Sequence, residues 1–139
     1  MRRLLEERKL TRFKASEEMV LKEVDGARYD VERAKKSLSE RDYKWATIQA
    51  YYSMFHLARA LILKLGYRER SHRALLTALR ELYVKTGKLD MESLEDLSNA
   101  MDLREEADYG MVFSQASAMR VTEKAERFLE TVSRILQIN

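Results

Sequence analysis

Residues 50–61 read AYYSMFHLARAL, and this stretch decides the fold. It lies in the middle of a run from about Asp42 to Leu65 in which apolar residues recur every three to four positions. The apolar positions cover more than half of a helix circumference, so the helix is expected to be buried on several sides. Gly66 follows the run and is a favoured residue just past a helix end. We therefore expect this helix to be the central one of the protein.

The same apolar spacing predicts four more helices around the central one. They are expected at about residues 16–38, 71–86, 91–109 and 114–136. Ser16 and Ser71 are suitable N-cap residues, and Gly87 and Gly110 follow two of the predicted helix ends. Helices of this length with short links pack against antiparallel neighbours. The sequence therefore predicts an all-α protein, an up-and-down antiparallel bundle of four to five helices.

Length and composition agree with one helical domain over residues 1–139. The chain has 139 residues, no proline and four glycines, so it offers few places for the turns that a sheet requires. Good helix formers dominate the composition. Residues 1–15 are expected to be either a basic N-terminal extension, in the form of a loose arm, or the start of the first long helix.

Charge is distributed unevenly along the chain, although the net charge is only +3. Residues 1–15 hold six basic and two acidic residues, a local charge of +4. A second basic patch of +4 lies between Arg59 and Arg73, and the strip Asp90–Asp108 carries −7. These patches indicate either contacts with charged partners or solvated helix faces.

Several classes of protein are not indicated. The chain has no cysteine, which excludes a disulfide framework and a thiolate metal site. His56 and His72 lack the spacing of metal ligands, and no glycine-rich phosphate loop is present, so we expect no metal and no cofactor. No apolar run approaches the roughly 18 residues of a membrane span. We expect a cytoplasmic protein with no membrane association.

Polar residues on the central helix are the first candidates for a functional site. Tyr52, His56 and Arg59 are spaced by four and three residues and so share one helix face, for which packing gives no reason. This face could lie opposite Arg104 across the bundle or across a dimer. The alternative for His56 is a buried histidine with a purely structural hydrogen bond.

The end of the 91–109 helix supplies a second group of candidates. Arg104 carries a guanidinium fork that suits a phosphate, and Tyr109 could donate a hydroxyl at the same site. Arg104 and Asp108 could instead form an ordinary surface ion pair, because they are four residues apart. His72 follows the N-cap Ser71 and, with Arg70 and Arg73, makes a helix end that attracts anions or is simply capped and exposed.

The order of these residues resembles the small stand-alone HEPN proteins of archaea and bacteria. The resemblance spans about residues 16–136 and rests on four motifs: Tyr-Tyr-x-Met-Phe-His at 51–56, Ser71-His72-Arg73, Leu103-Arg104 and Ala107-Asp108-Tyr109. It implies a four- to five-helix bundle, usually a homodimer, often encoded beside a minimal nucleotidyltransferase. Many HEPN proteins are metal-independent ribonucleases that act as toxins or in defence, and others bind nucleotides or act only as interaction partners.

The sequence departs from the ribonuclease motif of that family, in which an Arg is followed by a His one to two helical turns later. Asp108 follows Arg104 instead, and neither His56 nor His72 lies in the motif. An ionised aspartate would repel a phosphate. It could act as a base on a 2′-hydroxyl, but it could not protonate a leaving oxygen at neutral pH.

The sequence leaves three hypotheses open. The chain could bind nucleotide or RNA in a polar cleft, as part of a toxin–antitoxin or defence pair with a nucleotidyltransferase. It could be a non-catalytic interaction module that docks a basic surface through the strip Asp90–Asp108. It could also be a degenerate metal-independent ribonuclease with Arg104, Asp108 and His56 as catalytic residues. The residues predicted to bind the ligand are Arg104, Tyr109, Tyr52, Arg59, His72, Arg70 and Arg73.

Overall fold

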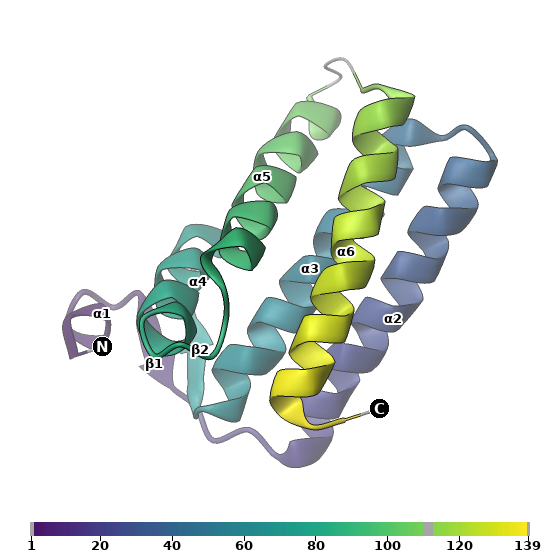
Figure 1. The fold of residues 1–139 in the computed structure, drawn as a ribbon. Helices are drawn as coiled ribbons and strands as arrows, with labels where there is room; N and C mark the ends of the chain where they lie inside the picture. The colour runs from purple at the N-terminus through teal and green to yellow at the C-terminus, as the bar shows by residue number, and fades with distance from the viewer. Residues whose placement is uncertain (1, 110–112, 139) are drawn as a thin grey trace.

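The structure is a computed structural model that describes residues 2–109 and 113–138. The elements in chain order are α1 (Arg2–Glu6), β1 (Leu10–Arg12), α2 (Glu17–Ser39), α3 (Tyr43–Lys64), β2 (Tyr67–Glu69), α4 (His72–Leu79), a π-helical segment (Arg80–Val84), α5 (Met91–Asp108) and α6 (Gln115–Leu136). Figure 1 shows α2, α3, α5 and α6 as long, roughly antiparallel rods, with α4 and the two short strands beside one end of α3. The all-α, up-and-down bundle predicted from the sequence is confirmed.

The central position of α3 is also confirmed. This helix packs against α2, α4, α5 and α6. Most of its side chains are buried, and Tyr51, Met54, Leu57, Leu61 and Ile62 are among the large side chains that are fully enclosed. Burial of so much apolar surface is the main stabilising contribution to a bundle of this size.

Side-chain caps fix where the helices begin. The five helices of eight or more residues start after Ser16, Asp42, Ser71, Asp90 and Ser114, and each of these side chains accepts the backbone N–H of the residue three positions later. Such caps satisfy N–H groups that have no partner inside the helix. Gly66 and Gly87 follow α3 and the π-helical segment with φ of +89° and +79°, as expected for glycines after helix ends. Gly110, the other predicted stop, lies outside the described residues.

The helix predicted at residues 71–86 is not regular throughout. It ends as an α-helix at Leu79 and continues as the π-helical segment Arg80–Val84. The wider turn accompanies a buried contact, because the Tyr83 hydroxyl donates a hydrogen bond of 2.6 Å to the backbone oxygen of Leu61 in α3. The Tyr83 contact joins residues 22 positions apart, and apolar spacing along the sequence cannot reveal it.

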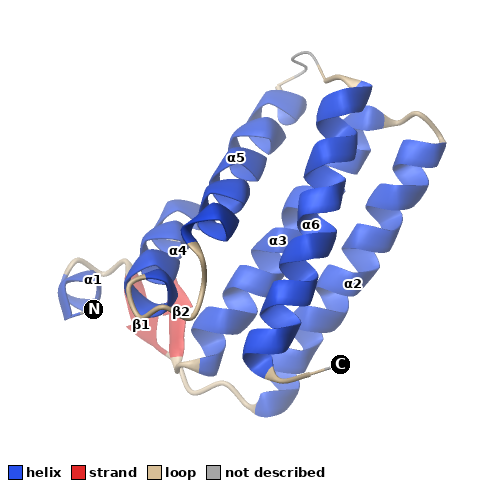
Figure 2. Ribbon diagram, viewed as in Figure 1, coloured by secondary structure: helices blue, strands red, loops and turns tan. Residues whose placement is uncertain are grey.

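Residues 2–15 differ from the sequence expectation. They neither extend α2, which begins at Glu17, nor form a loose arm. Instead β1 pairs with β2 in an antiparallel ribbon, with Leu10 opposite Glu69, Thr11 opposite Arg68 and Arg12 opposite Tyr67. Figure 2 shows these two strands beside α4 and the end of α3. Leu10 and Leu4 are buried, so burial of apolar side chains holds the segment against the bundle.

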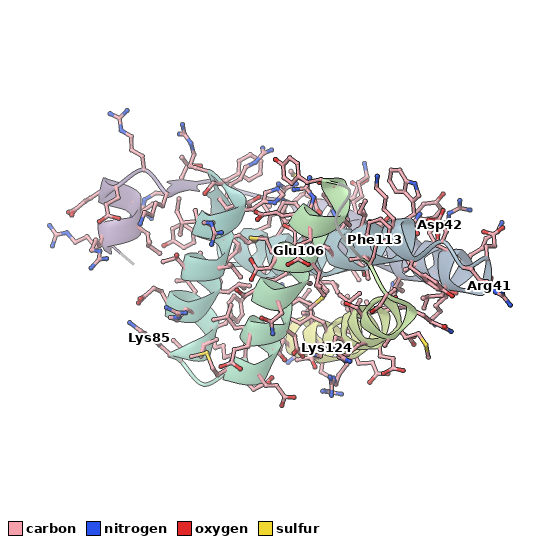
Figure 3. The ribbon with its side chains drawn as sticks, turned by 90° about the horizontal axis from the view of Figure 1, so that it is seen from above. Arg41, Asp42, Lys85, Glu106, Phe113 and Lys124 are labelled. Carbon is pink, nitrogen blue, oxygen red and sulfur yellow. The ribbon has the colours of Figure 1, made fainter. Side chains whose placement is uncertain are left out.

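Figure 3 views the molecule from above and shows Arg41 and Asp42, in the turn between α2 and α3, at the end opposite the N-terminal segment. None of the helices in the described parts of the chain combines the length and apolar character that a membrane span requires. Within residues 2–109 and 113–138, no three His, Asp or Glu side chains are placed to hold a metal ion.

Candidate functional site

The predicted polar stripe on α3 is present. Tyr52, His56 and Arg59 are each half-buried, while the residues around them on α3 are buried. The three side chains turn to different neighbours, however. Tyr52 contacts α5, His56 contacts α2, and Arg59 lies between α2 and β2.

Arg104 meets Tyr52 across the bundle, which the sequence raised as a possibility. Its Nη2 donates a hydrogen bond of 2.9 Å to the Tyr52 hydroxyl, and its guanidinium carbon lies 5.5 Å from the centre of that ring. Arg104 Nε also lies 2.9 Å from Asp108 Oδ2, the ion pair that the spacing suggested. The N–H does not point at this oxygen, so the buried Nε makes no hydrogen bond within the described part of the chain. The guanidinium is therefore held in place by Tyr52 and Asp108, and 28% of the Arg104 side chain is exposed.

His72, which the sequence analysis grouped with Arg104 among the ligand-binding candidates, lies in the same region. Its Nδ1 is 2.7 Å from the Tyr51 hydroxyl, and its ring centre is 4.4 Å from that of Phe55. Burial lowers the pKa of His72, and the positive charge of Arg104 lowers it further. Burial also raises the pKa of Tyr51 well above its ordinary value, so the phenol stays protonated. We use the name Arg104 cluster for the residues Tyr51, Tyr52, Phe55, His72, Arg104 and Asp108.

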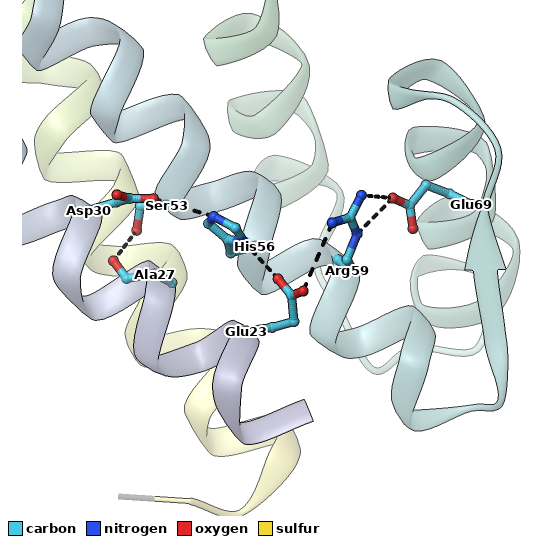
Figure 4. A network of polar contacts seen from close by, with 7 residues as sticks. All are labelled: Glu23, Ala27, Asp30, Ser53, His56, Arg59 and Glu69. Atoms are coloured by element: carbon cyan, nitrogen blue, oxygen red, sulfur yellow. Dashed lines mark hydrogen bonds and ion pairs between the residues drawn. The ribbon is translucent and has the colours of Figure 1, made fainter. Parts of the chain in front are cut away.

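His56 points away from Arg104. Figure 4 shows its ring between two carboxylates of α2, with Nδ1 2.7 Å from Glu23 and Nε2 3.5 Å from Asp30. Burial raises the pKa of Asp30, and the charge of His56 opposes this effect. His56 thus makes the structural hydrogen bond of the alternative, although its side chain is 31% exposed, and it is not placed beside Arg104. Its contacts link α3 to α2.

Arg59 is engaged in a partly buried ion pair. Its Nε and Nη2 both donate to Glu69 Oε2, at 2.8 and 2.6 Å, and its Nη1 is 3.9 Å from Glu23 (Figure 4). The side chain of Glu69 is only 3% exposed. The Arg59 guanidinium also lies 4.6 Å from the centre of the Phe55 ring, a cation–π contact. Arg59 thus connects the β1–β2 ribbon to α3.

The remaining predicted residues lie at the surface. Tyr109 is 83% exposed at the end of α5, so its hydroxyl faces solvent. Arg70 and Arg73 are exposed on either side of His72. Of the predicted residues, the structure thus brings together Tyr52, His72, Arg104 and Asp108. The sequence reasoning missed Tyr51 and Glu69 as polar partners, because their contacts depend on the packing of distant segments.

The chemistry available to the Arg104 cluster follows from these contacts. An arginine with free N–H groups binds phosphate oxygens in a fixed geometry. A histidine with a lowered pKa is neutral at pH 7 and can accept a proton. If Nδ1–H donates to the Tyr51 oxygen, then Nε2 of His72 carries the free lone pair. The cluster therefore combines a cation, paired with Asp108, with a neutral base.

The chain is similar to known proteins over most of its length. Residues 22–138 match the HEPN domain. A "UPF0332 protein" of Archaeoglobus fulgidus is 33% identical over 111 residues, which cover 78% of this chain and 88% of that protein. "Putative toxin MJ0142" of Methanocaldococcus jannaschii is 33% identical over 86 residues, which cover 57% of this chain and 58% of that protein.

A solved structure shares the fold. The protein TT1696 from Thermus thermophilus superposes with a TM-score of 0.71, over 84% of this chain and 97% of that one, at 18% identity. At this identity the likeness concerns the fold alone. The sequence match over residues 22–138 and the relative from Archaeoglobus fulgidus establish the family. The chain belongs to the HEPN domain family.

Proposed function

We propose that this protein binds RNA through phosphate contacts in the Arg104 cluster. The observation that carries the proposal is the position of Arg104, whose guanidinium is fixed by Tyr52 and Asp108 while 28% of its side chain stays exposed. A cation that is already oriented loses little freedom when it binds a phosphate. The neutral His72 supports a catalytic form of the same function, metal-independent cleavage. In this step His72 takes the proton of a 2′-hydroxyl, the 2′-oxygen bonds to the adjacent phosphorus, and the 5′-oxygen leaves with a proton from water.

The biological setting is part of this proposal. Two relatives are named as toxins, which favours a role for this protein as a toxin or in defence. We also infer that it acts in the cytoplasm with a minimal nucleotidyltransferase as its partner. A homodimer is supported by Trp45, which is 51% exposed and lies seven residues before Tyr52 on the same face of α3. Sedimentation of the wild type and of Trp45→Glu tests the dimer, and a monomeric wild type would contradict it.

RNA binding is tested with Arg104→Ala, with the matched surface variant Arg120→Ala on α6 as control. We expect binding of a labelled RNA pool to fall by about tenfold or more for Arg104→Ala, because a charged hydrogen-bond donor to phosphate contributes about 1.5–3 kcal/mol. The control should bind like the wild type. Equal binding by both variants and the wild type would overturn the proposal. A competition with free mononucleotide distinguishes a nucleotide site from an RNA site.

Cleavage is tested separately, without metal ions, on the same RNA pool. Loss of cleavage in both Arg104→Ala and His72→Ala, with cleavage retained in His56→Ala, would support His72 as the base. Cleavage that depends on His56 would instead support the assignment drawn from sequence. Absence of cleavage by a wild type that binds RNA would leave binding as the function of the cluster.

A second candidate function rests on α5. Its residues Glu92, Glu95, Asp102 and Glu106 are exposed, recur on one helix face, and form no ion pair within the described residues. This acidic face supports docking of a basic partner protein. Asp96, also part of the predicted strip, is different: it is 8% exposed and bound by Lys124 at 3.1 Å.

The docking test must therefore avoid Asp96, whose reversal would disrupt the α5–α6 contact. We expect Glu92→Lys with Glu95→Lys to abolish co-purification of a nucleotidyltransferase partner without lowering the melting temperature. Glu123→Lys with Glu130→Lys, at exposed positions of α6, is the matched control. Retained co-purification by the α5 variant would count against this role.

A further inference from the structure

The β1–β2 ribbon joins two basic segments that lie far apart in the sequence. The N-terminal residues and the patch around Arg68 each carry an excess of positive charge, and the pairing of Thr11 with Arg68 places them side by side. The backbone N–H of Arg70 continues the pairing with a 3.0 Å hydrogen bond to the oxygen of Lys9. Two separate patches thus become one basic surface.

Alternation along the two strands sorts their side chains between two faces. Leu10 and Glu69 are opposite each other and buried, Leu10 in the core and Glu69 against Arg59. The neighbouring positions on the other face hold Lys9, Arg68 and Arg70, which are exposed. The only acidic residue of the two strands is therefore turned inward, and the outer face of the ribbon is positive.

Most of the cations at the ribbon have no carboxylate partner within the described residues. Lys9 pairs with Glu7 at 3.1 Å. The others form no ion pair within the parts of the chain that the structure describes; they are Arg8, Arg12, Lys14, Arg68, Arg70 and Arg73. Two of them lie over aromatic rings, Arg68 at 5.5 Å from the centre of Phe13 and Arg12 at 6.0 Å from that of Tyr67. Unpaired guanidinium groups are suited to bind phosphate in a forked geometry.

We propose that the outer face of the β1–β2 ribbon binds the phosphodiester backbone of single-stranded RNA and guides the RNA strand into the Arg104 cluster. This inference rests on the proposed function. The connection is direct, because β2 ends at Glu69 and His72 of the cluster follows three residues later. Glu69 and His72 anchor this short stretch to α3, through Arg59 and Tyr51, while Arg70 and Arg73 remain at the surface.

The number and arrangement of the cations favour a polymer over a free nucleotide. A mononucleotide can neutralise only a few of these charges, whereas a strand that follows the ribbon contacts several in succession. A single strand can also bend from the ribbon into the half-buried cluster, which a stiff duplex cannot do.

The test measures binding of a fluorescein-labelled oligouridine by anisotropy over a range of salt concentrations. The variant Arg68→Gln with Arg70→Gln removes two charges from the outer face. The matched control, Arg41→Gln with Arg120→Gln, removes two exposed charges elsewhere, and Figure 3 shows Arg41 at the opposite end of the molecule. A third variant, Arg68→Lys with Arg70→Lys, changes the same two positions but keeps their positive charge. It shows whether substitution at these positions disturbs the fold.

We expect the ribbon variant to bind roughly tenfold more weakly, and the slope of log affinity against log salt to shrink by about 1.4, the contribution of two phosphate contacts to a single strand. The control and the lysine variant should keep the wild-type slope. Wild-type binding by the ribbon variant, with binding lost in Arg104→Ala, would overturn the ribbon assignment and leave the cluster standing. Ribbon-dependent binding to anionic vesicles or to the acidic α5 face of a second copy, without RNA binding, would overturn it as well.

Discussion

The guanidinium of Arg104 donates a 2.9 Å hydrogen bond to the hydroxyl of Tyr52, a residue 52 positions earlier in the chain. This bond joins α5 to the polar stripe of α3 and sets the direction in which Arg104 presents its remaining N–H groups. The ion pair with Asp108 supports the same orientation from within α5. The candidate site therefore depends on the packing of two helices rather than on a local motif.

The bond between Tyr52 and Arg104 is tested by Tyr52→Phe. We expect the free energy of unfolding to fall by about 1 kcal/mol, because one partly buried hydrogen bond is lost. RNA affinity should fall less than in Arg104→Ala, since the charge remains but is no longer fixed. Urea denaturation and anisotropy measure the two effects. A variant with unchanged stability and unchanged affinity would show that the hydroxyl does not hold Arg104.

The lowered pKa of His72 predicts a particular pH dependence of stability. As the pH falls, His72 takes up a proton in the unfolded chain before it does so in the folded chain. Protonation of the unfolded chain lowers the free energy of unfolding. The stability that neutral His72 contributes is fully present above its ordinary pKa of 6.5, and it is lost as the pH falls through the lower pKa of the folded chain. We expect His72→Gln to lose less stability than the wild type over this window. Thermal melts in a pH series measure it.

A separate control covers the acidic end of that series. The raised pKa of Asp30 has the opposite effect on stability. The stability that the protonated carboxyl contributes is present below its ordinary pKa of 3.8 and is lost as the pH rises through the higher pKa of the folded chain. The variant Asp30→Asn should therefore change the pH dependence of the melts only between 3.8 and the higher folded value, and above it should shift the melting temperature by a constant amount. Identical pH profiles for the wild type and His72→Gln would contradict the assignment.

Gly26 offers a stabilising substitution. It lies within α2, and a Cβ built there would meet the ring of His56 at 3.8 Å, an ordinary contact. We expect Gly26→Ala to raise the free energy of unfolding by about 0.5–1 kcal/mol, since alanine is the better helix former. Gly87→Ala is the matched comparison and should destabilise, because Gly87 has a φ of +79°. A destabilised Gly26→Ala would indicate that His56 cannot tolerate the contact.

The pair formed by Arg59 and Glu69 predicts unequal effects of two substitutions. Glu69→Ala leaves the half-buried Arg59 without its main partner, and we expect a loss of about 2–3 kcal/mol. Glu69→Gln keeps an oxygen that can accept from Arg59, so its loss should be smaller. Urea denaturation of the two variants compares them directly. Equal, small losses would mean that the ribbon is anchored by Leu10 alone.

The helices could be predicted because their signals are local. Ser16 and Ser71 cap helices as expected, and the apolar spacing around Met54 and Leu61 marks the central helix. The strand Leu10–Arg12 could not be predicted in the same way. Three residues are too few to show a period, and their conformation depends on pairing with residues 67–69.

The candidate site could likewise be predicted only where the signals are local. The shared face of Tyr52, His56 and Arg59 follows from helix geometry and was predicted. Which neighbour each of them meets depends on how α2, α5 and β2 pack, and only the Tyr52–Arg104 contact was anticipated. His72 was expected to be a capping or phosphate-binding residue at a helix end. Its contacts with Tyr51 and Phe55 are visible only once α4 is placed against α3.

The β1–β2 ribbon also sets an order of events during synthesis of the protein. Residues 10–12 leave the ribosome before their partner strand, and the whole α2–α3 hairpin is made in between. Leu10 can be buried only after Glu69 has emerged, so the basic N-terminal segment stays undocked while the two long helices form. The nascent chain is thus expected to close its N-terminus onto an existing hairpin as a late step, and the outer face of the ribbon is assembled at that moment.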